Sequence, residues 1–169
     1  ISMRADIFAS RSIELENAKA IDMANATGES EWINKAAFLT PITKVFGTEI
    51  GINISNLGVQ IHGGMGFIEE TGAAQFSRDV RVTAIYEGTN GIQAMDLVGR
   101  KMMDNGETAY AIINQIKEYI DNLSGVKKDL SGLLELANET LRETVESLIS
   151  KKEVSDRFGG AMPFLMGFA

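Results

Sequence analysis

The chain has 169 residues with a formal net charge of −7, and its composition, 44% hydrophobic and 23% charged, is typical of a globular protein and excludes disorder as its main state. A net acidic chain without a basic stripe is a poor electrostatic match for nucleic acid, so no nucleic-acid partner is expected. Cysteine is absent and His62 is the only histidine, which excludes disulfides, thiolate catalysis and metal sites built on several cysteines or histidines, and no metal site is expected.

Helical spacing of apolar residues begins almost at the first residue. Residues 2–26 are predicted to form a helix that Gly28 ends, and Ser30 is predicted to cap the next helix. The first helix is predicted to place on one side the apolar residues Phe8, Leu15, Ala18 and Ile21.

The second long segment has an apolar residue at every third or fourth position, which is a helix signature. These residues are Ile42, Phe46, Ile50, Ile54, Leu57 and Ile61. Pro41 lacks a backbone donor, so we expect a kink or a fresh helix start near residues 39–41. The glycine-rich sequence at 63–66 is predicted to end the helix.

Several shorter segments follow. We expect a short helix around residues 72–81, a turn at 86–89, and a helix that carries Ile92, Met95, Gly99 and Met102. Residues 104–106 are predicted to stop that helix. Two further helices are expected on 109–123 and 130–148, joined by residues 124–129, and a final helix is expected from near Val154 to the end of the sequence.

These segments predict an all-α helical bundle built from apolar helix faces with short connections. No uninterrupted apolar run approaches the roughly 20 residues that cross a bilayer, so no membrane span is expected. The sequence becomes rich in Glu, Lys and Leu after residue 103, which suggests one domain at 1–103 and an appended helical region at 104–169. Because the sequence opens without Met and closes on an apolar run, we expect a fragment in which the appended region is truncated.

Two stretches differ from ordinary bundle sequence. In residues 60–66, Gln-Ile-His-Gly-Gly-Met-Gly, the glycines permit positive φ and exposed amide donors that suit an anionic ligand such as a diphosphate, although a tight turn explains them equally well. In residues 85–93, Ile-Tyr-Glu-Gly-Thr-Asn-Gly-Ile-Gln, Glu87 lies on a glycine-containing turn before a helix. From the residues alone, Glu87 reads as a charge favoured by the helix dipole, with Thr89 or Asn90 as the cap.

Taken together and in order, these two stretches and the Ser-Arg-Asp element at 77–79 resemble the C-terminal helical domain of the acyl-CoA dehydrogenase family of flavoenzymes. The resemblance covers residues 1–103. It is strongest to the larger members with an extra C-terminal helical region, the group typified by 3-methylthiopropanoyl-CoA dehydrogenase. The resemblance implies an FAD-dependent enzyme that removes a proton from the α-carbon of an acyl-CoA thioester and passes the β-hydride to flavin.

The resemblance assigns the α-proton base to Glu87, the glutamate of the Tyr-Glu-Gly-Thr motif. Such a base needs a raised pKa, which burial in a dry site provides. In the family the backbone N–H of the same glutamate also donates to the thioester oxygen, together with a flavin ribityl hydroxyl, and a donor of this kind lowers a barrier by about 2.7–4 kcal/mol. Gly88 is expected to let the thioester lie against the turn.

The resemblance also implies FAD contacts. In the family a Gln-x-x-x-Gly element of one subunit holds the FAD of its neighbour, which places Gln60, Gly63 and Gly64 at the cofactor. Thr89 matches a further FAD contact. Many relatives have a glutamine at the position of Gly91, so here either the side chain of Asn90 or the backbone is expected to replace that contact.

The expected partners are therefore an acyl-CoA substrate, a second copy of the chain in a homo-oligomer, and an electron-transferring flavoprotein. The family implies a soluble enzyme of the bacterial cytoplasm or, in a eukaryote, of the mitochondrial matrix. Two alternatives remain open: a non-catalytic helical scaffold or interaction module derived from the same family, and a flavin-binding helical protein with other redox chemistry. His62 is interpreted as structural, and residues 78–79 as a local ion pair.

Overall fold

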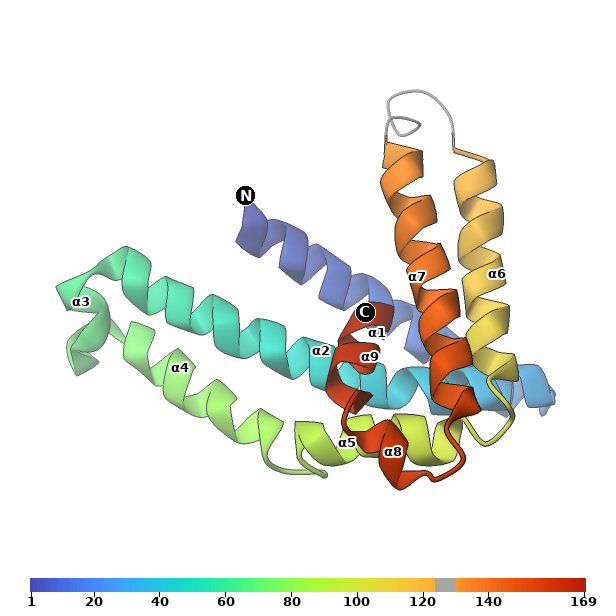
Figure 1. The fold of residues 1–169 in the computed structure, drawn as a ribbon. Helices are drawn as coiled ribbons and strands as arrows, with labels where there is room; N and C mark the ends of the chain where they lie inside the picture. Colours follow the sequence, from blue (N-terminus) through green and yellow to red (C-terminus); the bar gives the residue numbers. More distant parts are fainter. Residues whose placement is uncertain (124–129) are drawn as a thin grey trace.

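The structure, a computed structural model, describes residues 1–123 and 130–169. The described residues are all-α and contain no strand, which confirms the predicted fold class (Figure 1). The elements in chain order are α1 (Ser2–Thr27), α2 (Ser30–His62), α3 (Gly64–Phe67), the 3₁₀ turn η1 (Glu69–Thr71), α4 (Ala73–Arg81), the 3₁₀ turn η2 (Val82–Ala84), α5 (Asn90–Asp96), the π-helical turn η3 (Leu97–Lys101), α6 (Glu107–Asp121), α7 (Ser131–Ser150), α8 (Ser155–Phe158) and α9 (Ala161–Phe168).

Helix α2 is the element on which most of the others pack. Helices α1 and α4 run alongside it, and α5, α6 and α9 also contact it. The α6–α7 hairpin projects from one end of this layer, and α3 closes the other end (Figure 1). The connection at 124–129, which the sequence predicts to join α6 to α7, lies outside the described residues. Among the described helices, none combines the length and apolar character needed to cross a bilayer.

The junction of α1 and α2 is a tight glycine turn. Gly28 ends α1 as predicted, with a φ of 70° and a hydrogen bond from its N–H to the carbonyl oxygen of Ala24. The predicted cap at Ser30 is wrong, because Ser30 is the first helical residue and Glu29 occupies the N-cap without a side-chain hydrogen bond. Instead, the hydroxyl of Thr27 accepts from the N–H of Glu29 at 3.2 Å.

The buried side chains of α1, which packs on α2, are short. Its buried residues are Ser10, Asn17 and Ala20. A Cβ on Gly47 of α2 would lie 3.6 Å from Ser10 Oγ, so the two helices approach closely here. The apolar residues predicted to share one side of α1 are exposed; Phe8, for example, is 75% exposed.

Helix α2 continues through Pro41, so the predicted fresh helix start is wrong. Proline removes one backbone donor from the helix, but here it is buried between Phe38 and Ile42, both of which belong to the core. Packing against the rest of the bundle therefore holds the helix together where the sequence alone predicts a break. The glycines after His62 end the helix as predicted.

The core draws on both parts of the sequence. Its buried apolar side chains form one cluster, contributed by α2, α5, η3, α6, α7 and α9. They are Phe38, Leu39, Ile42, Val45, Ala94, Leu97, Val98, Met102, Ala109, Ile113, Val145, Leu148, Ala161, Phe164 and Leu165. The division into 1–103 and 104–169 stays a prediction, and residues on both sides of it share this core.

The last predicted helix is two short helices instead. Helix α8 ends at Phe158 and α9 begins at Ala161, because Gly159 and Gly160 have low helix propensity and separate them. The break allows α9 to fold back into the core. There the ring of Phe168 packs edge-on against the rings of Phe38 and Phe164, with 5.2 Å and 5.1 Å between ring centroids. The stop predicted at 104–106 is confirmed, and Asp104 also accepts from the backbone N–H groups of Gly106 and Thr108 at the start of α6.

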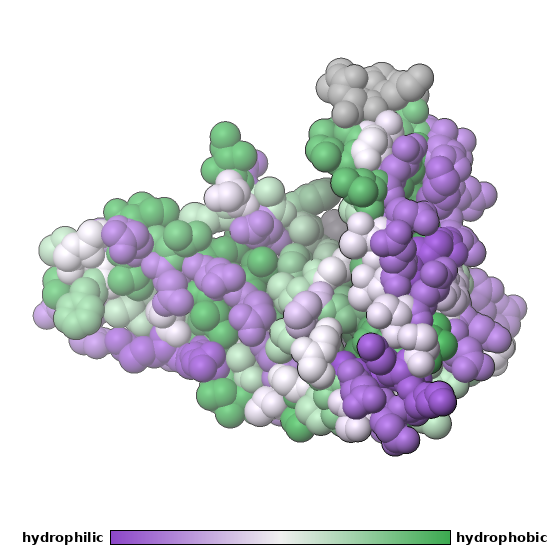
Figure 2. Space-filling view, viewed as in Figure 1, coloured by the Kyte–Doolittle hydropathy of each residue, from purple (hydrophilic) through white to green (hydrophobic). Residues whose placement is uncertain are grey.

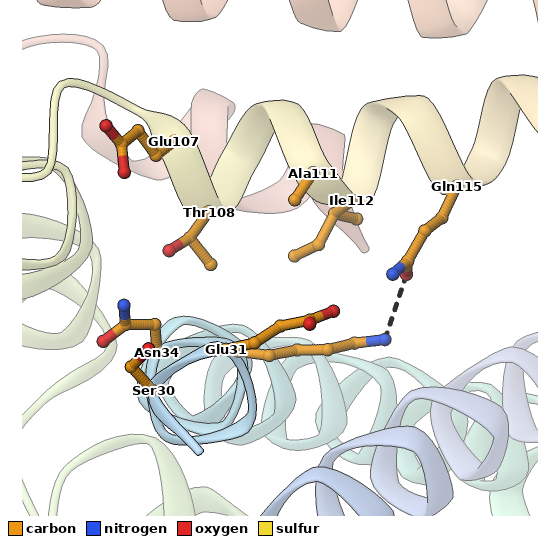
Figure 3. Close-up of a pocket in the computed structure, with 9 residues that line it drawn as sticks. Ser30, Glu31, Asn34, Glu107, Thr108, Ala111, Ile112 and Gln115 are labelled. Atoms are coloured by element: carbon orange, nitrogen blue, oxygen red, sulfur yellow. Dashed lines mark hydrogen bonds between the residues drawn. The ribbon is translucent and has the colours of Figure 1, made fainter.

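A buried lysine on α2 links three helices. Lys35 donates to Glu16 of α1 at 2.6 Å and to Gln115 of α6 at 3.1 Å. The hydrogen bond to Gln115 spans a polar cleft of about 230 Å³ between α2 and α6 (Figure 3). The hydrogen bond and charge of Lys35 lower the pKa of the Glu16 carboxyl, against an opposing effect of burial. Lys35 therefore ties α6 to the α1–α2 layer.

We predict that Leu165→Ala lowers the free energy of unfolding by about 2–5 kcal/mol, because it leaves a cavity in a core that spans both parts of the chain. Leu165 is fully buried, whereas the adjacent Met166 is 36% exposed, so Met166→Ala is the matched control. Urea denaturation measures both. Equal losses in the two variants would mean that α9 does not pack in the core.

Candidate functional site

The turn that connects η2 to α5 has an unusual backbone. Glu87 has a φ of 55° and Gly88 a φ of 80°, so two successive residues adopt the left-handed conformation. For a residue with a Cβ this conformation costs roughly 1–2 kcal/mol. A strained glutamate persists only where its surroundings hold it, and such residues cluster at functional sites.

Two side chains from different helices hold this turn. Gln93 of α5 donates from Nε2 to the carbonyl oxygen of Glu87 at 2.8 Å. Lys44 of α2 donates from Nζ to the carbonyl oxygen of Gly88 at 2.8 Å. Each of the two consecutive peptide groups is thus anchored by a hydrogen bond. A Cβ on Gly88 would lie 3.1 Å from Gln93 Nε2, which adds a steric reason for glycine at this position.

Asn90 is buried beneath the turn and joins it to α2. Its Oδ1 accepts from Lys44 Nζ at 2.7 Å, and its Nδ2 donates to Glu49 Oε1 at 2.7 Å. Its amide also contacts the hydroxyl of Thr48, with 3.0 Å from Nδ2 to Oγ1. Burial lowers the pKa of Lys44, and the charge of Glu49 opposes that shift. The predicted contact of Asn90 with FAD stays a prediction, and in this chain the amide already has partners on both of its polar atoms.

Thr89 is the N-cap of α5. This confirms one of the two caps that the sequence predicts, Thr89 or Asn90. Its hydroxyl oxygen accepts from the N–H of Ile92 at 3.3 Å. The hydroxyl hydrogen is not used by this bond, so the side chain can cap the helix and still donate to a ligand.

The turn forms part of the wall of a cavity of about 480 Å³. Helix α2 contributes Thr40 and Pro41, and α5 and η3 contribute Gln93 with the ion pair between Asp96 and Arg100. Glu87 is exposed at this wall, its carboxylate forms no ion pair with the described residues, and its backbone N–H donates to none of them. A carboxylate and an amide donor of one residue are therefore both available to a molecule in the cavity.

The predicted cofactor element lies at the other end of α2. Gln60, Gly63 and Gly64 are exposed, and Gly63 has a φ of 61°. Within the described residues the side chain of Gln60 has no hydrogen bond, and it lines a depression of about 680 Å³. Lys44, which contacts the Glu87 turn, precedes Gln60 by sixteen residues of helix, or roughly 24 Å. The structure does not bring the two predicted elements together within one chain.

His62 and Arg78, which the sequence analysis interpreted as structural residues, both make polar contacts within the fold. His62 Nδ1 lies 2.8 Å from the carbonyl oxygen of Gly58, one helical turn away. The predicted pair between Arg78 and Asp79 is wrong, because adjacent helical residues point in different directions. Arg78 instead forms an ion pair with Glu69 of η1 at 2.6 Å.

Sequence reasoning missed the residues that support the turn. Lys44 lies inside a predicted helix, more than forty positions before its partners, and no local pattern marks it. Gln93 is six residues after Glu87, and its return to that carbonyl depends on the left-handed turn between them. In the sequence, only the adjacent Gly88 indicated that Glu87 could adopt a positive φ.

Comparison with known proteins identifies the family. The model described as acyl-CoA dehydrogenase, C-terminal domain, matches residues 1–103, and the chain therefore belongs to the acyl-CoA dehydrogenase family. Members of this family are oxidoreductases that act on acyl-CoA substrates, are generally oligomeric and generally depend on FAD.

Individual relatives resemble the chain over different lengths. It is 38% identical to 3-methylmercaptopropionyl-CoA dehydrogenase of Ruegeria pomeroyi over 98% of its own length and 30% of that protein. It is 35% identical to the mitochondrial very long-chain specific acyl-CoA dehydrogenase of Rattus norvegicus over 48% of its length and 12% of that protein. A solved structure described as Bd2924 apo-form has a TM-score of 0.75 at 22% identity, over 99% of this chain and 30% of that one, and supports the fold alone. The chain thus spans less than a third of these proteins.

We predict that Gly88→Ala destabilises the protein by about 1–2 kcal/mol, because a Cβ is strained at this φ and crowds Gln93. Gly91→Ala is the matched control. Gly91 lies in the first turn of α5, and its Cβ would meet only Thr89 Oγ1 at 3.9 Å, so alanine there is expected to be neutral or slightly stabilising. Thermal unfolding compares the two, and a Gly88 variant as stable as the Gly91 variant would contradict the observed turn.

Proposed function

We propose that this chain supplies the α-proton base of an acyl-CoA dehydrogenase and that Glu87 is that base. The observation that carries the proposal is the strained turn at the cavity wall, with an unpaired carboxylate and an unpaired backbone N–H on the same residue. A base and a donor in fixed relation match a reaction that removes a proton next to a carbonyl group, because negative charge then develops on the carbonyl oxygen.

In the proposed reaction the Glu87 carboxylate takes the proton from the α-carbon of the thioester. The electron pair of the broken C–H bond forms the α,β double bond as a hydride leaves the β-carbon. The N–H of Glu87 donates to the thioester oxygen and stabilises the charge on it, and Gly88 allows the thioester close to the turn. Bound FAD supplies the chemistry that the chain lacks, acceptance of that hydride.

The chemistry expected of Glu87 requires a drier environment than this chain provides. Glu87 is exposed here, whereas a glutamate that accepts an α-proton near neutral pH works best with a raised pKa, which burial produces. We infer that surfaces beyond this chain, together with substrate, cover the cavity. This inference agrees with relatives of which the chain spans less than a third.

The residues proposed to hold FAD fit a ligand with polar and anionic groups. Gln60 has an unused amide, Gly63 and Gly64 have space where a Cβ would stand, and Thr89 retains a hydroxyl hydrogen. Backbone amides near glycines suit a diphosphate. Asn90 is the weakest of the proposed cofactor contacts, because its amide already bonds to α2.

The separation of these residues supports a shared cofactor. Gln60 and the Glu87 turn lie roughly 24 Å apart along α2, so we propose that Gln60 of one subunit completes the FAD site of another. Large apolar side chains are exposed around Gln60, as expected of an association surface. They are Ile61, Met65, Phe67 and Phe76, at 72%, 60%, 80% and 73% exposed, and hydrophobic residues gather at this end of the molecule (Figure 2).

Electron transfer to an electron-transferring flavoprotein, and a bacterial cytoplasmic or mitochondrial matrix location, are proposed on family grounds. The thioester named in the Ruegeria pomeroyi relative is a natural test substrate beside short- and medium-chain acyl-CoA. If acyl-CoA does not bleach the flavin in the following experiment, the chain belongs to a flavoprotein with other redox chemistry. If the protein binds no FAD, it is a helical scaffold without catalysis.

We predict that full-length protein containing this chain loses its visible flavin absorbance when acyl-CoA is added anaerobically, and that Glu87→Gln abolishes this bleaching while FAD stays bound. Glutamine keeps the shape and the backbone N–H but cannot accept the proton. Glu118→Gln, on the exposed surface of α6, is the control and should bleach like the parent. Bleaching of the Glu87 variant at the parental rate would refute the proposed base, and a protein that binds no FAD would favour the scaffold.

We also predict that the sharing of FAD appears as complementation between two inactive variants. A hetero-oligomer of Gln60→Ala and Glu87→Gln subunits, purified through two different tags, contains some sites with both residues intact if the residues come from different subunits. Such a preparation should recover up to about half of the parental activity per flavin in an isologous pair. If both residues come from one subunit, every site is defective and activity stays absent.

A further inference from the structure

We propose that Lys44 is a positioning residue for Glu87, which it acts on through the main chain and not through the carboxylate. This inference rests on the proposed role of Glu87 as the base. It concerns a residue on a different helix, more than forty positions earlier in the sequence.

The ammonium group of Lys44 binds the main chain of the turn and the side chain of Asn90. It donates to the carbonyl oxygen of Gly88 at 2.8 Å and to Asn90 Oδ1 at 2.7 Å. Within the described residues it forms no ion pair with the carboxylate of Glu87, which lies in the same turn. A direct ion pair would stabilise the charged form of Glu87 and make it a weaker base. Contact with the backbone holds the turn and leaves the carboxylate unpaired.

Lys44 and Gln93 bind different carbonyl groups of the turn. Gln93 binds the carbonyl oxygen of Glu87, and Lys44 binds the next carbonyl oxygen, that of Gly88. Two consecutive peptide planes are therefore held from α5 on one side and from α2 on the other. The donor N–H and the carboxylate of Glu87 are left free by this arrangement, which is what a base that also acts as a donor requires.

The part of α2 that carries Lys44 is held by the core. Lys44 lies between Ile42 and Val45, both fully buried in the core, so the helix beneath it cannot shift without disturbing the bundle. Asn90 reinforces the connection, because it binds Lys44 and Glu49 at once. Catalytic geometry is best maintained when the supporting residues sit on packed secondary structure.

The backbone of the turn is strained at Glu87. A glutamate with a φ of 55° relaxes towards common backbone conformations when its restraints are removed. The strong donor from α2 is the restraint that Lys44→Met would delete. A displacement of about 1 Å at the base is enough to slow a reaction roughly 100-fold. We therefore expect Lys44 to affect the rate of proton removal more than substrate binding.

The test uses full-length, FAD-loaded protein with four variants: Lys44→Met, Lys44→Arg, Lys35→Met and Glu87→Gln. Lys35 is the matched control, because it is a lysine of the same helix that also bridges two acceptors, Glu16 and Gln115, but does not contact the Glu87 turn. Anaerobic flavin bleaching by acyl-CoA is recorded over a range of thioester concentrations. The substrate is used with hydrogen and with deuterium at the α-carbon.

Lys44→Met is expected to lower the limiting bleaching rate by about 10- to 100-fold, with little change in FAD content or in the half-saturating thioester concentration. The isotope effect of α-deuteration should increase, because proton removal becomes more rate-limiting. Lys44→Arg keeps a cationic donor and should recover most of the rate. Lys35→Met should reduce thermal stability while its bleaching rate and isotope effect stay parental. If Lys44→Met does not fold, Lys44→Gln replaces it, since its shorter polar side chain also loses the contact with Gly88.

The results separate this inference from the function on which it rests. Parental bleaching in Glu87→Gln would overturn the proposed base and this inference with it. If Glu87→Gln is inactive but the Lys44 variants behave like Lys35→Met, only the inference is overturned. A fall in rate without any increase in the α-deuterium effect, or without recovery in Lys44→Arg, would assign Lys44 a purely structural role and would also overturn it.

Discussion

The hydrogen bonds that tie the turn at Glu87 to helix α2 are the constraint on which the site depends. A left-handed glutamate beside a left-handed glycine is not stable by itself, and the energy that holds it comes from donors on two helices. Those donors are useful only because α2 is locked by the core on its opposite face. The geometry of Glu87 thus depends on the whole bundle, and its proposed chemistry depends on the rigidity of α2.

The length of α2 has a second consequence. The helix spans 33 residues, so its two ends are roughly 50 Å apart, and groups placed near its middle and near its end cannot meet at one small ligand in a single chain. The proposed sharing of an elongated cofactor between subunits would resolve this separation, and the apolar side chains exposed around Gln60 are consistent with a covered surface. The same rigidity that positions Glu87 therefore favours an oligomer.

The helices after residue 103 share the core of the bundle. Helix α9 inserts Phe164 and Leu165 among residues of α2 and α5, and Lys35 reaches across to Gln115 of α6. The alignment with the Ruegeria pomeroyi relative covers nearly the whole chain, whereas the family model ends at residue 103. Because α9 packs against α2 and α5, it stabilises the two helices that hold the Glu87 turn.

The sequence by itself determined the all-α class, most helix boundaries and the motif that carries Glu87, because apolar periodicity and glycine positions are local properties. Tertiary structure decided the rest. Packing carried α2 through Pro41, left the predicted apolar side of α1 exposed, and placed α9 against the core after the break at Gly159 and Gly160. It also selected Lys44 and Asn90 as supports of the turn. Contacts between residues more than forty positions apart depend on how helices pack, and no local pattern in the sequence encodes them.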